Sequence, residues 1–130
     1  MKTVYLHLNS RDEFMRVDIS KIVYFESDGN YTKFVLINKL QGIVAMNLSH
    51  MQQTLKNSLK ENAIGFIKVG KKHIINSRYV FKFSPSRQIM LLSDGENFAY
   101  KLEISKSALK QLRELYLQSL NNTQITDNNK

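Results

Sequence analysis

The chain has 130 residues, and 19 Lys and Arg residues against 11 Asp and Glu residues give it a formal net charge of +8 at pH 7. This length fits one domain with a modest core, and a hydrophobic content of 42% is typical of globular proteins rather than disordered ones. Cysteine is absent, which excludes disulfides, thiol catalysis and thiolate metal sites and suits the reducing cytoplasm, where we expect the protein to act. No apolar stretch approaches the ~20 residues of a membrane-spanning helix, so we expect no integral membrane segment.

The first half of the chain has the alternating apolar pattern of β-strands. Val4, Leu6 and Leu8 alternate with polar residues, and a turn-like segment over 9–13 leads into a second strand. Residues 1–17 are therefore predicted to form an N-terminal hairpin. Further strands are predicted over 22–27, 31–37 and 43–46.

A helix is predicted over about 47–60. Asn47 is a favourable N-cap residue, and four apolar residues follow at helical spacing while Gln and Lys cover the other side. These apolar residues are Leu48, Met51, Leu55 and Leu59. Their spacing indicates that one face of the helix packs on the core.

The second half returns to short strands and ends in a helix. Strands are predicted over 66–69, 74–76, 79–84, 89–92 and 98–104. Ser105 is then placed to cap a terminal helix over about 105–120, with Leu109, Leu112 and Tyr116 on one side. Many short strands with two peripheral helices indicate a mostly β domain over residues 1–120, followed by a flexible polar tail over 121–130.

The sequence contains no recognisable catalytic or metal-binding pattern. His7, His50 and His73 have no metal-ligand spacing, and each is interpreted as a structural or surface residue. Asp28 and Asp94 both precede glycine in turns, where Asp is favoured for bonding to the local backbone. We therefore expect no enzyme activity, no metal and no cofactor.

The most basic part of the chain runs from Asn62 to Ser93. It contains six Lys and Arg residues and no acidic residue: Lys68, Lys71, Lys72, Arg78, Lys82 and Arg87. A field of one sign attracts polyanions, and nucleic acid and anionic membrane are the two obvious partners. An incidental basic surface is the remaining interpretation.

Polar and basic side chains also gather at the predicted strand ends. They occur over Asn30–Lys33, over Gly70–His73 and at Ser105–Lys106. Each stretch would place hydrogen-bond donors on an anchored loop, which suits contact with phosphates and base edges. Any one of them alone would be interpreted as a solvated turn.

The order of three motifs resembles the LytTR-type DNA-binding domain. Ile22–Tyr31 (IVYFESDGNY) resembles that family's "I-x-Y-x-E-S-x-x-x-Y" stretch. Phe66–Asn76 (FIKVGKKHIIN) is similar to its "F-x-R-x-H-[RK]-S-[YF]-[IV]-[IV]-N" segment, and Leu102–Lys106 (LEISK) to its closing "L-P-[VI]-S-[RK]". The resemblance runs from Val17 to Leu115, and the predicted helix over 48–59 falls where the family has one.

The resemblance implies an elongated, mostly β fold of several small antiparallel sheets. It also implies a bacterial transcription regulator that binds duplex DNA sequence-specifically, through loops that contact successive major grooves. Members of the family often bind paired repeats as dimers, so a homodimer on DNA is expected.

The resemblance and the three polar stretches together select the candidate site. By position, the family's DNA contacts fall on Thr32, Lys33, Lys71, Lys72 and Lys106. The full set of candidate DNA-binding residues is Asn30, Thr32, Lys33, Lys71, Lys72, His73 and Lys106. Gly70 stands where the family often has histidine, Lys72 where it has serine, and Glu103 where it has proline. These departures leave the base-reading contacts open.

Most domains of this family follow a phosphorylated receiver domain. The short segment before Val17 has the pattern of a hairpin and leaves no room for one. We therefore expect a stand-alone member, controlled by other means such as a regulatory protein partner.

Two other functions remain open. The rings of Tyr31, Phe34 and Tyr79 could form a stacking platform for single-stranded nucleic acid, although strand alternation places them mostly in the core. Alternatively, the Leu-rich terminal helix, Ser105–Leu120, could make the chain a protein or membrane adaptor.

Overall fold

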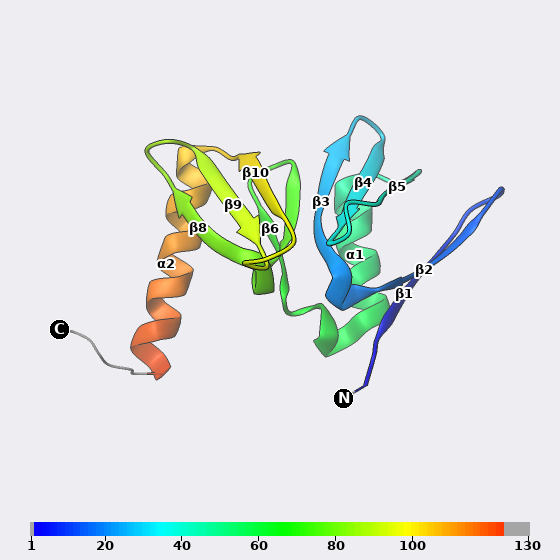
Figure 1. The fold of residues 1–130 in the computed structure, drawn as a ribbon, viewed down its shortest axis with the longest axis horizontal. Helices are drawn as coiled ribbons and strands as arrows, with labels where there is room; N and C mark the ends of the chain where they lie inside the picture. Colours follow the sequence, from blue (N-terminus) through cyan, green and yellow to red (C-terminus); the bar gives the residue numbers. More distant parts are fainter. Residues whose placement is uncertain (1, 124–130) are drawn as a thin grey trace.

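The computed structural model describes residues 2–123, and these form three antiparallel sheets and two α-helices. Figure 1 shows the elements spread along the long axis, with the N-terminal hairpin near one end and the last helix, α2 (Lys106–Thr123), at the other. The predicted fold class, an elongated and mostly β domain of small antiparallel sheets with two peripheral helices, is confirmed.

The central sheet has five strands in the spatial order β5-β4-β3-β7-β6. The middle strand, β3, pairs with β4 across a two-residue turn and with β7 from the second half of the chain. The strands are β3 (Ile22–Asp28), β4 (Tyr31–Leu36), β5 (Gln41–Val44), β6 (Phe66–Val69) and β7 (His73–Asn76).

Both faces of the central sheet are buried, which explains why β3 carries four consecutive buried residues from Ile22 to Phe25. Phe25 belongs to one core cluster, whereas Val23 and Tyr24 both belong to a second cluster on the other face. Neighbouring residues normally point to opposite faces. A register irregularity between Ile22 and Tyr24 accounts for the exception.

The first core cluster is covered by helix α1 (Leu48–Leu59), which confirms the helix predicted from the apolar spacing. Asn47 caps the helix, because its side chain accepts a hydrogen bond of 2.8 Å from the amide of His50. The helix buries Leu48, Met51, Leu55 and Leu59, as the spacing predicted.

The N-terminal hairpin closes the other side of this cluster. Strands β1 (Tyr5–Asn9) and β2 (Phe14–Asp18) form a sheet of their own. The buried residues Leu6, Leu8 and Val17 anchor that sheet in the first cluster.

The second core cluster is covered by a three-stranded sheet and by α2. The strands are β8 (Val80–Ser84), β9 (Ile89–Ser93) and β10 (Ala99–Glu103), in the order β10-β9-β8. Leu109 and Leu112 of α2 are buried in this cluster, and the ring of Tyr116 lies 6.1 Å from that of Phe83.

Helix α2 continues past the predicted end at residue 120. Residues 121–123 are helical, which corrects the prediction that a flexible tail begins at residue 121. The rest of that predicted tail, residues 124–130, lies outside the described residues. In the part of the chain that the structure describes, neither helix is long and apolar enough to cross a membrane.

Gly42 in β5 provides a test of how tightly the first cluster is packed. A Cβ atom at Gly42 would lie 2.2 Å from Cζ of Phe34, whose ring is 3% exposed and has no free space to enter. We expect Gly42→Ala to lower the free energy of unfolding by about 1–3 kcal/mol through overpacking, as measured by urea denaturation.

The control for this substitution is Gly65→Ala. The nearest atom to a Cβ at Gly65 is Oγ of Ser77, at 3.8 Å, so the methyl group fits without a clash. Equal destabilisation by both variants would contradict the packing seen around Phe34.

Candidate nucleic-acid interface

Four loops that are distant in sequence meet along one edge of the molecule. The amide of Ser27, at the end of β3, donates a 2.8 Å hydrogen bond to the carbonyl of Lys72 in the β6–β7 loop. The amide of Ile104, before α2, donates a 3.0 Å hydrogen bond to the carbonyl of Gln88 in the β8–β9 turn. Figure 1 shows this edge at the top, with the β3–β4 turn, the β8–β9 turn and the beginning of α2 all reaching it.

The β6–β7 loop consists of Gly70, Lys71 and Lys72, and both lysines are exposed. Gly70 has a φ of +69°, a conformation that glycine adopts without steric cost. A Cβ atom there would also contact Ala108 at 3.6 Å, so the loop lies directly against α2. Glycine at this position therefore lets the chain turn back while presenting two lysines side by side.

A groove of about 610 Å³ separates this loop from the beginning of α2. Lys71, Lys72 and His73 form one wall, and Ser105 and Ala108 contribute to the other. The side-chain oxygen of Ser105 accepts a 3.3 Å hydrogen bond from the amide of Ala108, which caps the helix as predicted. The groove thus lies between two lysines and the positive end of a helix dipole, which favour anions, and Glu103 adds one carboxylate to its lining.

Lys106 extends the basic surface on the helix side, and Asn30 extends it on the other side. Lys106 is the first residue of α2 and is exposed. Asn30 is exposed at the tip of the β3–β4 turn, next to Gly29, whose φ is +64°. Strand pairing therefore fixes the turn that carries Asn30, and helix capping fixes the first turn of α2 that carries Lys106.

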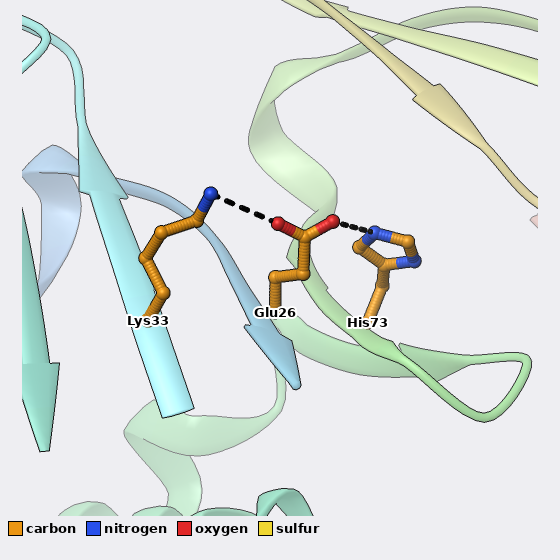
Figure 2. A network of polar contacts seen from close by, with 3 residues as sticks. All are labelled: Glu26, Lys33 and His73. Atoms are coloured by element: carbon orange, nitrogen blue, oxygen red, sulfur yellow. Dashed lines mark hydrogen bonds and ion pairs between the residues drawn. The ribbon is translucent and has the colours of Figure 1, made fainter. Parts of the chain in front are cut away.

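Beneath the loops, three charged or titratable side chains form a row across the central sheet (Figure 2). Glu26 of β3 lies directly opposite Lys33 of β4 and opposite His73 of β7. One carboxylate oxygen of Glu26 lies 3.0 Å from Nζ of Lys33, and the other lies 2.9 Å from Nε2 of His73. The carboxylate therefore joins two of the predicted site residues.

Burial and the contacts within this row determine the protonation states of Glu26 and His73. Burial lowers the pKa of His73, and the opposing effect of Glu26 does not offset it. Burial raises the pKa of Glu26, but the hydrogen bonds from Lys33 and His73 outweigh it and hold that pKa below its usual value. At neutral pH, Glu26 is thus ionised and His73 is a neutral donor through Nε2–H.

Two of the predicted contact residues lie inside the protein. Thr32 is 0% exposed, and its hydroxyl donates a 2.8 Å hydrogen bond to the carbonyl of Met46. His73 is 4% exposed and belongs to strand β7, although the sequence placed it in the basic loop. Both side chains are buried in this structure, and the expectation that they contact DNA stays a prediction. The structure brings Asn30, Lys71, Lys72 and Lys106 to the exposed edge, with Lys33 half-buried behind them.

Sequence reasoning missed Glu26 and Arg87. Arg87 is exposed in the β8–β9 turn, which only the tertiary structure places beside the beginning of α2. The pairing of Glu26 with Lys33 could have been predicted from the sequence. A two-residue turn at Gly29 and Asn30 pairs residue 28 with 31, and hence Glu26 with Lys33.

Comparisons with known proteins bear on the family and on the fold. A family model described as the LytTr DNA-binding domain matches residues 12–117. The fold is also similar to the solved LytTr DNA-binding domain of a Bacillus cereus protein described as a methyl-accepting/DNA response regulator, with a TM-score of 0.59 and 21% identity, covering 89% of this chain and 98% of that one. No curated protein matches the chain.

The row predicts a pH dependence of stability. Because burial lowers the pKa of His73 below 6.5, the unfolded chain binds the proton more readily than the folded protein. Stability is therefore full above pH 6.5 and falls as the pH drops toward the lower pKa of the folded state. Glu26 adds a loss of the same sign only below pH 4.5.

The measurement is urea unfolding between pH 7.5 and 5.5, where we expect the free energy of unfolding of the unaltered protein to decrease. His73→Gln, which keeps a neutral donor, should reduce that decrease. His50→Gln, at an exposed position on α1, is the control and should retain it. A pH dependence unchanged by His73→Gln would contradict the protonation state assigned to the row.

Proposed function

This chain belongs to the LytTr DNA-binding domain family. We propose that it is a transcription regulator that binds duplex DNA sequence-specifically through the basic edge, the edge that carries Asn30, Lys71, Lys72, Arg87 and Lys106. The family binds DNA and is not a family of enzymes, which supports a regulatory role. The observation that carries the proposal is the groove at that edge, which Lys71 and Lys72 line and beside which Lys106 is exposed at the first residue of α2.

Affinity would come mainly from phosphate contacts. Lys71 and Lys72 are exposed on a fixed loop and Lys106 at the first residue of α2, and each lysine that neutralises a phosphate releases condensed counterions from the DNA. Arg87 lies on the same edge and adds to this field. The beginning of α2 contributes further, because its amides and dipole favour an anionic oxygen. Binding of this kind weakens steeply as salt increases.

Sequence preference would come from side chains that reach into the major groove. Asn30 stands at a turn tip and could pair with adenine, and Lys71 could donate to the acceptors of guanine. Thr32 is buried and fixes the position of β4 against Met46. The paired-repeat sites, the homodimer on DNA, the regulatory partner and the cytoplasmic location remain part of the proposal.

A second candidate function rests on helix α2. Leu117 and Leu120 are 45% and 55% exposed and lie three residues apart on one side of the helix, which favours a protein-binding face there; Leu115, 57% exposed, lies on another side. A platform for single strands has less support. Phe34 and Tyr79 are buried in different core clusters, which leaves only Tyr31 exposed.

Replacing Lys71 with Ala separates the two kinds of contact. If Lys71 reads a base, binding to a selected duplex should weaken by about 1–3 kcal/mol and preference at one position should relax. If it touches only phosphate, binding should weaken evenly across sequences, and the slope of log K against log salt should become shallower by about one. Fluorescence anisotropy with a sequence selected from a random duplex pool measures both.

Lys56→Ala is the matched control, since Lys56 lies on α1 and away from the basic edge. It should leave affinity and salt slope close to those of the unaltered protein. Equal effects of the two substitutions would show that DNA meets another surface.

The preference for duplex DNA is tested by competition. Unlabelled duplex should displace a bound duplex more efficiently than single strands of equal length and composition, because the loops are spaced along an edge and two of the three candidate rings are buried. Preferential displacement by single strands would overturn the duplex proposal.

A further inference from the structure

Glu26 places a carboxylate within the row that supports the basic edge. Its side chain is 31% exposed, and that of Lys33 is 27% exposed, so both reach solvent. A negative charge beside a surface that binds a polyanion opposes binding. An ion pair this exposed contributes little to stability, so stability alone does not account for its position.

The geometry determines what the carboxylate does to its neighbours. It accepts from Lys33 with one oxygen and from His73 with the other. His73 is neutral at pH 7, so the charges of Glu26 and Lys33 cancel and the row has a net charge near zero. The Lys33 ammonium points across the sheet toward Glu26, as Figure 2 shows, and a phosphate would have to compete with the carboxylate for it.

We propose that Glu26 is a positioning residue that limits sequence-independent DNA binding by holding Lys33 out of phosphate contact, so that Lys71, Lys72 and Lys106 carry the electrostatic contacts. This inference rests on the proposed function. His73 completes the arrangement, because its donation to the second oxygen holds the carboxylate in line with Lys33. In this arrangement, the lysines available for phosphate contact are those on the loops and at the beginning of α2.

Glu26→Gln tests the inference with little change of shape. A glutamine places an NH2 group where one of the two carboxylate oxygens stood, so it cannot accept from Lys33 on one side and His73 on the other, and it does not hold a lysine by charge. Lys33 is then free to reach a phosphate. The slope of log K against log salt for a random-sequence duplex should become steeper by about 0.9. The gain in affinity over the unaltered protein should therefore be about 3.5-fold larger at 50 mM salt than at 200 mM.

A double-substitution cycle shows whether the gain in DNA affinity in Glu26→Gln depends on Lys33. Lys33→Gln alone should leave the slope nearly unchanged, since Lys33 is already neutralised. Glu26→Gln combined with Lys33→Gln should lose the steeper slope. A purely structural role for Glu26 would instead weaken binding, and that loss would be independent of Lys33. Far-UV circular dichroism and urea unfolding of each variant establish that it is folded.

Glu61→Gln is the matched control for net charge. Glu61 is exposed in the short 3-10 turn Lys60–Ala63, which follows α1 and lies at the opposite edge in Figure 1. This substitution should leave the slope unchanged. Three results would overturn the inference while leaving duplex binding intact: an unchanged slope in Glu26→Gln, an equal steepening in Glu61→Gln, or a shallower slope in Lys33→Gln alone. Failure of the unaltered protein to bind any duplex would overturn both proposals.

Discussion

The pairing of β3 with β4 on one side and with β7 on the other is the interaction on which the rest of the structure depends. It joins the two halves of the chain into one sheet, whose two faces are each covered by a core cluster. It also brings the β3–β4 turn and the β6–β7 loop to the same edge. The two strands are antiparallel, so the end of β3 lies beside the beginning of β7. The candidate interface is therefore a direct result of strand order.

The same pairing explains how short loops can present the candidate interface. Its lysines stand on short loops that are fixed at both ends by strands or by a capped helix. Such loops lose little conformational entropy on binding, since they are already ordered. Behind them, Glu26 and Lys33 cancel each other's charge, which confines the positive field to the loop tips. In the proposed account, the affinity for DNA and the limit on that affinity both depend on the pairing of β3 with its neighbours.

Much of this fold could be predicted from the sequence. Both helices have clear apolar periodicity and a capping residue, and nearly all strands have a recognisable apolar pattern. The burial of Thr32 and His73 was harder to predict. Both lie on strands of a sheet covered on both faces, where alternation does not separate inside from outside. Thr32 does share its strand face with Phe34, and that parity was the available signal. The β3–β7 pairing joins distant segments, so no local pattern could reveal the contact between Glu26 and His73.

The most direct test of the central claim, that DNA meets the loops of the basic edge, is a duplex titration of the isotope-labelled protein followed by backbone amide NMR shifts. We predict that the largest shifts map to the β3–β4 turn, the β6–β7 loop and the first turn of α2. Shifts confined to the second half of α2 or to the N-terminal hairpin, with these loops unchanged, would contradict it.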